Sequence, residues 1–226
     1  MEKRLIIAID GPAASGKSTT ARRLAQKLGY VYLDTGAMYR ACALKAKQTG
    51  LALGDEEAVW AMLEKLDIEI KLDGEENVIL LDGKDVSGAI RANDISRLSS
   101  DISALPAVRY KMVELQRRLG SRGGVILDGR DIGTFVFPDA DIKIFLTATD
   151  EIRARRRWLE LKHKGVHASI DKVSEELRER DKNDSSRELA PLTKAADAIE
   201  VDTSAMNVEE QAEAIYGIVK ARMAGI

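Results

Sequence analysis

The eight residues from Gly11 to Ser18, GPAASGKS, constrain the fold of this chain more than any other feature. They match G-x-x-x-x-G-K-[ST], the Walker A phosphate loop, which lies between a buried strand and a helix. The apolar run Leu5–Ile9 predicts that strand, and the stretch Lys17–Leu28, followed by Gly29, predicts that helix. A chance glycine-rich turn would lack this setting, so we predict a phosphate-binding loop.

The residue types in the loop suit a phosphate. Gly11 and Gly16 allow turns that residues with a Cβ resist, and backbone N–H groups then converge on the anion at the helix N-terminus. Lys17 brings a positive charge to the β- and γ-phosphates, and Ser18 offers a hydroxyl to Mg²⁺.

Length and composition exclude several classes of function. The chain has 226 residues, 45% of them hydrophobic, which suits one large domain with a full core. A net charge of −2 and an aromatic content of 4% argue against nucleic-acid binding. The single cysteine, Cys42, cannot form an internal disulfide. No segment reads as a signal peptide or a membrane span, so we expect a cytoplasmic protein.

Strand-like and helical patterns alternate along the chain, which predicts an α/β fold with a mostly parallel sheet flanked by helices. The expected core strands are Leu5–Ile9, Val31–Leu33, Val125–Leu127, Ile142–Leu146 and Ala198–Val201. The expected helices are Lys17–Leu28, Ala37–Lys47, Ala107–Leu119, Ile152–Lys162 and Val208–Met223.

Two segments interrupt this alternation within a single domain, residues 1–226. The runs Ile68–Leu72 and Val78–Leu81, joined by the turn at residues 73–77, predict a small antiparallel β insert over residues 66–91. Residues 151–187 are charged and poor in apolar side chains, which predicts a mobile helical lid over the core.

Two strand ends carry further polar residues. The segment from Asp34 to Arg40 follows the second strand; Thr35 is placed to cap the next helix, and Arg40 to bind an anion. Asp128 ends the strand Val125–Leu127, as a Walker B carboxylate that serves Mg²⁺ does. Arg130 and Asp131 follow it in the same loop.

Arg180, Asp184 and Arg187 are spaced to share one face of a helix. They fit two interpretations equally well. One is an ion-pair ladder on a solvated helix, which contributes little. The other is a pair of arginine forks, oriented by Asp184, that close on the transferred phosphate and the substrate.

Several stretches together resemble one family, in the same order and spacing along nearly the whole chain. They are residues 9–19, 33–40, 98–109, 128–134, 137–140, and 180–187 with Ala190-Pro191-Leu192. These stretches are similar to those of the bacterial cytidylate kinases. The segment Ile68–Val86 resembles the enlarged monophosphate-binding insert of that family.

The resemblance implies a P-loop nucleoside monophosphate kinase with a lid. It would use ATP and Mg²⁺ and act as a monomer on CMP and dCMP, without nucleic-acid or membrane partners. The implied ATP site is Gly11, Pro12, Ala13, Ala14, Ser15, Gly16, Lys17, Ser18 and Thr19, with Ser18 and Asp128 on the metal. The implied acceptor site is Thr35, Arg40, Ser100, Arg109, Arg130, Asp131, Arg180, Asp184 and Arg187. Lys17, Arg130, Arg180 and Arg187 would stabilise the transferred charge.

Two other interpretations remain. One is another small-molecule P-loop kinase with UMP, AMP or shikimate as its acceptor; the Asp128–Gly133 motif and the insert argue against it. The other is a nucleotide-dependent switch protein. A GTPase switch would carry Asn-Lys-x-Asp, which this sequence lacks.

Overall fold

The computed structural model describes residues 4–73 and 76–223. These residues form two compact units, which are described separately. The phosphate-loop unit contains residues 4–32 and 123–223, and the middle unit contains residues 33–73 and 76–122. The predicted insert, residues 66–91, lies within the middle unit, and its turn residues Gly74 and Glu75 lie outside the described residues.

A five-stranded sheet contains β1 (Ile6–Asp10), β2 (Val31–Asp34), β6 (Val125–Gly129), β7 (Ile142–Thr147) and β8 (Ile199–Asp202). Its strand order is β2-β6-β1-β7-β8, and β1 pairs in parallel with both β6 and β7. Because β1 and β6 are neighbours, the loops that follow them leave the same edge of the sheet. The predicted α/β fold with a parallel sheet is confirmed.

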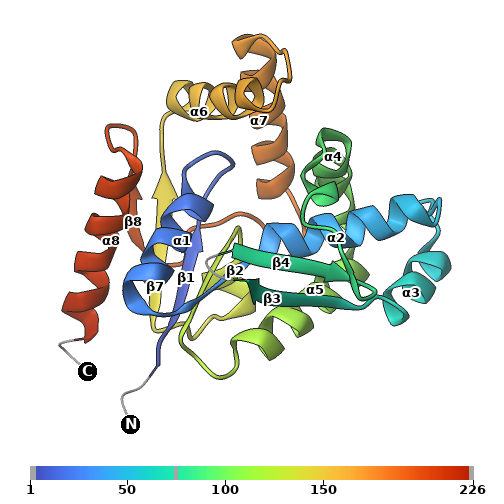
Figure 1. Ribbon diagram of the computed structural model, residues 1–226, viewed down its shortest axis with the longest axis horizontal. Coiled ribbons are helices and arrows are strands. Elements are labelled where there is room, and N and C mark those ends of the chain that lie inside the picture. Colours follow the sequence, from blue (N-terminus) through green and yellow to red (C-terminus); the bar gives the residue numbers. More distant parts are fainter. Residues whose placement is uncertain (1–3, 74–75, 224–226) are drawn as a thin grey trace. The chain divides into compact units, whose positions relative to one another are not determined.

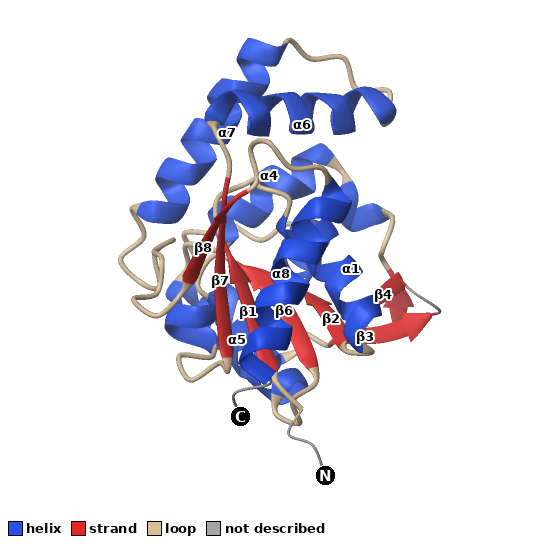
Figure 2. Ribbon diagram, turned by 90° about the vertical axis from the view of Figure 1, so that its left-hand side faces the viewer, coloured by secondary structure: helices blue, strands red, loops and turns tan. Residues whose placement is uncertain are grey.

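Helices α1 (Lys17–Leu28) and α8 (Val208–Met223) pack together on one face of this sheet (Figure 2). Leu24 and Ile215 from these helices are buried against Ile7 and Ile9 of β1. Strand β1 is apolar on both sides over most of its length, as a strand buried within a parallel sheet must be.

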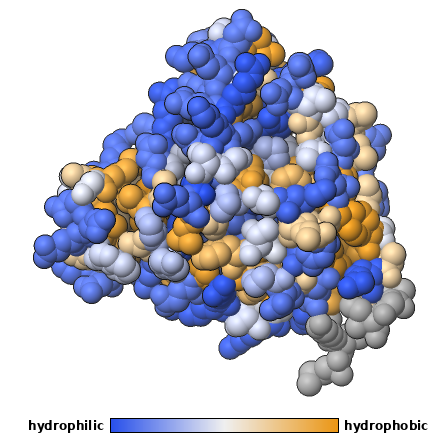
Figure 3. Space-filling view, turned by 180° about the vertical axis from the view of Figure 1, so that it is seen from behind, coloured by the Kyte–Doolittle hydropathy of each residue, from blue (hydrophilic) through white to orange (hydrophobic). Residues whose placement is uncertain are grey.

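The charged segment forms two helices, α6 (Asp150–His163) and α7 (Ile170–Ser185). They lie above the loop between β1 and α1 (Figure 1), where the surface is mostly hydrophilic (Figure 3). Leu161 of α6 and Val173 and Leu177 of α7 nevertheless form a small apolar core that includes Ala13 of the loop. The lid segment is therefore packed against the phosphate loop in this structure.

The middle unit contains a three-stranded antiparallel sheet, β3 (Ile68–Asp73), β4 (Glu76–Leu81) and β5 (Lys84–Asp85). Its α-helices are α2 (Thr35–Gln48), α3 (Glu56–Glu64), α4 (Asn93–Ile102) and α5 (Pro106–Gly120), and a short 3₁₀ helix, η1, spans Ala89–Arg91. Met38, Leu63, Ile102 and Met112 belong to its own hydrophobic core, which is consistent with a separate compact unit.

All five predicted core strands and all five predicted helices are present, with ends shifted by two residues or fewer. The antiparallel pairing of the segment from Ile68 to Asp85 is also as predicted. Helices α3 and α4 were not predicted from the sequence. No helix within residues 4–73 or 76–223 is long and apolar enough to cross a membrane.

Candidate active site

The phosphate loop follows β1 and leads directly into α1. Gly11 has φ of +145°, and a Cβ there would lie 2.1 Å from the carbonyl oxygen of Leu146. Gly16 caps α1 in the left-handed region, and a Cβ there would lie 2.5 Å from Gln211 Oε1. Gly11 is therefore required by conformation and by space, because the clash is with backbone, whereas Gly16 is required by its left-handed conformation.

Lys17 turns back onto the loop. Its Nζ lies 2.5 Å from the carbonyl oxygen of Pro12 and 3.3 Å from Ser15 Oγ, and only 5% of the residue is exposed. Burial and the nearby Arg130 guanidinium lower the pKa of Lys17, against the attraction of Asp128 and Asp10. A phosphate bound beside this amine would therefore stabilise its positively charged form.

Asp128 lies at the end of β6, where the Walker B interpretation expects a carboxylate. Ser18 donates a hydrogen bond from Oγ to Asp128 Oδ2 at 2.6 Å, and Tyr32 donates from its hydroxyl to Oδ1 at 2.8 Å. The two proposed metal ligands, Ser18 and Asp128, are therefore in direct contact. Tyr32 fixes the orientation of the carboxylate, which the sequence analysis did not foresee.

Arg130, Asp184 and Arg187 form a buried charge cluster. Asp184 Oδ2 accepts from Arg130 Nε at 2.7 Å, and its Oδ1 accepts from Arg187 Nη2 at 2.6 Å. Burial raises the pKa of Asp184, but Arg130, Arg187 and the nearby Arg180 lower it more, so the net shift is downward. Asp184 is 5% exposed, so this cluster is not a solvated ion-pair ladder.

The prediction that Arg180, Asp184 and Arg187 share one face of a helix is only partly correct. Arg180 and Asp184 lie on α7, but the helix ends at Ser185 and Arg187 lies beyond its cap. Arg187 reaches Asp184 because it folds back, with its Nε 3.3 Å from the carbonyl oxygen of Asp184. The predicted helical face extended two residues beyond the end of α7, because residue spacing alone does not show where a helix ends.

Replacing Asp184 with asparagine is expected to destabilise the protein by about 3 kcal/mol at pH 7, because two partly buried arginines lose their shared counter-charge. The lowered pKa makes this contribution present above the unfolded pKa of Asp184 and lost as the pH falls through the folded one. Urea unfolding of both proteins at several pH values measures the difference. The Glu200→Gln variant, which breaks an exposed pair with Lys194, is the control and should stay within about 1 kcal/mol of the wild type. A small, pH-independent difference for Asp184→Asn would contradict the expectation.

The loop after β6 forms a π-helical turn, η2 (Ile132–Val136), which Asp131 precedes. Asp10, at the end of β1, accepts hydrogen bonds from the backbone N–H groups of Ile132 at 2.9 Å and Gly133 at 2.7 Å. Asp10 and Asp131 are both buried. Asp10 therefore fixes the backbone directly after Asp131.

Burial raises the pKa of Asp10 to about 6, although the two backbone N–H groups oppose the shift. Because the folded pKa lies above the unfolded value, Asp10 ionises more easily in the unfolded chain, and its contribution to stability decreases as the pH rises from about 4 to about 6. Relative to an Asp10→Asn variant, the wild type should lose about 2 kcal/mol of unfolding free energy between pH 4.5 and 7.5. Denaturant unfolding at the two pH values measures this, and a constant difference would contradict it.

In the middle unit, Asp34 and Arg40 pair at the start of α2. Asp34, not Thr35, caps the helix: its Oδ1 accepts from the N–H of Ala37 at 2.7 Å. Its Oδ2 accepts from Arg40 Nη2 at 3.1 Å. The expectation that Thr35 caps α2 is wrong, because the helix begins one residue earlier and Thr35 is its buried first residue.

Arg109 of α5 is almost fully buried, with 1% of the residue exposed. Its guanidinium lies 5.7 Å from the ring centroid of Tyr39, and Nη1 lies 3.4 Å from the carbonyl oxygen of Ser103. Ser100 lies near the end of α4, and its carbonyl oxygen accepts a hydrogen bond from Ser103 Oγ at 2.8 Å. The middle unit therefore brings α2, the end of α4 and α5 around one buried arginine.

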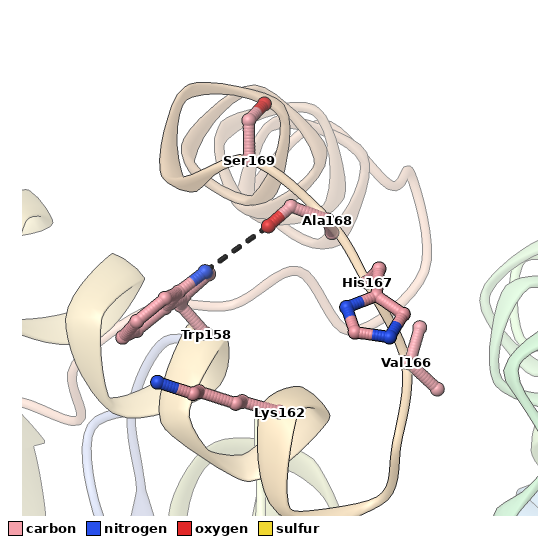
Figure 4. Close-up of a pocket in the computed structure, with 6 residues that line it drawn as sticks. All are labelled: Trp158, Lys162, Val166, His167, Ala168 and Ser169. Atoms are coloured by element: carbon pink, nitrogen blue, oxygen red, sulfur yellow. Dashed lines mark hydrogen bonds between the residues drawn. The ribbon is translucent and has the colours of Figure 1, made fainter.

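A hollow on the lid contains none of the predicted site residues (Figure 4). Trp158 of α6 lines it and donates from Nε1 to the carbonyl oxygen of Ala168 at 3.0 Å. The Lys162 amine lies 5.0 Å from the centre of the Trp158 ring. The hydrogen bond connects α6 to the segment that leads into α7, which is a structural function.

No function was predicted from the sequence for Asp10, Tyr32 or Asp181, although all three contact the phosphate loop or the strand ends. Asp10 alone had a local signal, since it is a carboxylate at a strand end directly before the loop. Contacts such as that between Asp181 and Ala13 join residues far apart in the sequence, and no local pattern predicts them.

The parallel sheet, the phosphate loop after β1 and the aspartate at the end of the adjacent β6 define a P-loop nucleotide-binding protein. A family model described as cytidylate kinase matches residues 7–221. The chain therefore belongs to the cytidylate kinase family.

Individual relatives agree with this assignment. A cytidylate kinase of Syntrophotalea carbinolica is 51% identical over 223 residues, which cover 98% of this chain and 94% of that one. A cytidylate kinase of Geobacillus kaustophilus is 48% identical and covers 99% of this chain and 100% of its own length. A solved structure of an uncharacterized protein from Eubacterium ventriosum shares the fold, with a TM-score of 0.51, 13% identity, and coverage of 97% of this chain and 99% of that one.

Proposed function

We propose that this chain transfers the γ-phosphoryl group of ATP to CMP or dCMP, giving ADP and CDP or dCDP. The observation that supports this most directly is the contact of Ser18 with Asp128 beside the buried arginine cluster around Asp184. It occurs in a chain that matches the cytidylate kinase model along nearly its whole length. Phosphoryl transfer requires positioning and charge stabilisation rather than covalent chemistry, and this cluster provides both.

On the donor side, we propose that the loop from Gly11 to Thr19 binds the ATP phosphates, with backbone N–H groups after Ala13, including those at the α1 N-terminus, as donors. Lys17 would leave Pro12 and pair with the β- and γ-phosphates. Arg130, Arg180 and Arg187 would stabilise charge on the transferred group, with Asp184 holding Arg130 and Arg187 in place. The acceptor is itself a phosphate, so the reaction needs no strong general base.

The pair of Ser18 and Asp128 fits Mg²⁺. Mg²⁺ prefers hard oxygen ligands and is usually held by one or two protein groups together with substrate phosphates. Among the described residues, no group of three or more His, Cys, Asp or Glu side chains is arranged to hold a metal. When bound, Mg²⁺ would neutralise phosphate charge, and Ser18 and Asp128 would hold it.

For the acceptor, we propose that Thr35, Arg40, Ser100 and Arg109 contribute to binding CMP, together with Arg130, Asp131, Arg180, Asp184 and Arg187. Residues 66–91 would be the monophosphate-binding insert and residues 151–187 a lid that excludes water. We also propose that the enzyme acts as a monomer, in the cytoplasm.

A coupled assay of ADP formation with CMP, dCMP, UMP, AMP and shikimate tests this function. We expect CMP and dCMP to give the highest kcat/KM by a wide margin and ATP consumption without an acceptor to be slow. Preference for UMP, AMP or shikimate would overturn the proposed acceptor. Acceptor-independent ATP hydrolysis would favour a switch protein.

A further inference from the structure

One peptide of the phosphate loop is held by two side chains from the lid helices. Asp181 of α7 accepts a hydrogen bond from the backbone N–H of Ala13 to its Oδ1, at 3.0 Å. Arg153 of α6 donates from Nη1 to the carbonyl oxygen of the same residue, at 3.1 Å. The backbone N–H and the carbonyl group of Ala13 are therefore both hydrogen-bonded to side chains of the lid helices.

The two side chains also hold each other. Arg153 Nη1 donates to Asp181 Oδ2, and Nη2 donates to Asp150 Oδ1 at 2.5 Å. The side chain of Arg153 is 7% exposed and that of Asp181 is 17% exposed. Charge-assisted hydrogen bonds with so little water around them are stronger and better oriented than surface ion pairs.

The loop needs such support at this point. Ala14, the next residue, has φ of +58°, in the left-handed region that a residue with a Cβ rarely adopts. A conformation of this kind persists only where the surroundings hold it in place. Ala13 is also packed in the apolar core of the lid helices, beside Ala154, Leu161 and Val173.

The end of α7 contacts two parts of the site at once. Asp181 binds the phosphate loop, and Asp184, three residues later, binds Arg130 after β6. A change in the position of α7 would therefore alter its contacts with both the phosphate loop and the arginine cluster.

We propose that Arg153 and Asp181 are positioning residues for the donor nucleotide: they hold the Ala13 peptide and so maintain the phosphate loop in the conformation that receives ATP. This inference rests on the proposed phosphoryl transfer from ATP. These contacts would make the conformation of the phosphate loop, and hence the affinity for ATP, depend on how α6 and α7 pack against the loop.

The test compares the KM for ATP with the KM for CMP in Asp181→Ala, Asp181→Asn and Arg153→Lys. Asp181→Ala should raise the KM for ATP about tenfold or more and change the KM for CMP less than about threefold. Asp181→Asn keeps an acceptor for the Ala13 N–H and should recover part of the loss. Glu160→Gln is the matched control, because Glu160 pairs with Arg157 and Lys164 on the same lid. It should leave both KM values within about twofold of the wild type.

A second measurement does not depend on turnover. Hydrogen exchange of residues 11–18 should be faster in Asp181→Ala than in the wild type, and calorimetry should show weaker binding of a non-hydrolysable ATP analogue. Unchanged exchange with unchanged analogue affinity, or equal increases in both KM values, would overturn the positioning function. A wild-type protein that fails to phosphorylate CMP would instead overturn the proposed function.

Discussion

Replacing Lys17 with alanine is expected to lower turnover with CMP by ~10²–10³ while the protein remains folded. Lys17 is the cation that the loop presents to the β- and γ-phosphates, and no other side chain of the loop replaces it. Its amine is buried against Pro12 and Ser15, where a positive charge is poorly solvated without an anion. Its loss therefore removes charge stabilisation of the transferred group and leaves the apolar core intact.

Steady-state kinetics and thermal unfolding of Lys17→Ala measure the two effects separately. Lys27→Ala is the matched control: Lys27 lies on the same helix, α1, but forms exposed ion pairs with Glu209 and Glu213. It should retain turnover within about twofold. Turnover of Lys17→Ala within a few-fold of the wild type would contradict the assignment of this loop as the donor site.

The second large effect concerns the choice of base. Cytosine presents an N4 amino donor with acceptors at N3 and O2, and a carboxylate accepts from N4. We expect Asp131 to accept from N4 and Arg109 to donate to N3 and O2, with Ser100 assisting. Uracil presents a carbonyl at position 4, so an acceptor oxygen of the base would face the acceptor oxygens of the buried Asp131 carboxylate. Because mispaired buried groups are costly, kcat/KM should favour CMP over UMP by ~10⁴.

Asp131→Asn tests this expectation, because its amide keeps the shape of the side chain and is able to donate to uracil O4. We expect kcat/KM for CMP to fall and the ratio of CMP to UMP to narrow by about 10². Asp139→Asn, an exposed aspartate a few residues later, should leave the ratio unchanged. A wild-type ratio in Asp131→Asn would mean that Asp131 does not read the base. A structural function beside Asp10 would then be the better explanation.

The sequence was sufficient to predict the elements of the sheet and the loop at its edge. The strands around β1 are short apolar runs bounded by turn residues, and Lys17–Leu28 and Val208–Met223 have helical patterns with clear ends. Helices α3 and α4 were missed because they are short, at 9 and 10 residues, so each offers few turns of a periodic pattern. Cap positions were also misjudged, as Asp34 and Thr35 show.

By itself, the sequence determined the fold class, the phosphate loop and the residue types available for chemistry, because these depend on motifs and on hydrophobic spacing over a few residues. Only the tertiary structure decided which groups meet. Ser18 and Asp128 are 110 residues apart, Arg130 and Asp184 are 54 apart, and Ala13 and Asp181 are 168 apart. Such pairs form because the parallel sheet brings separate strand ends to one edge and the lid helices pack onto the loop there. That packing comes from the burial of apolar side chains throughout the unit, which no local pattern of charged residues encodes.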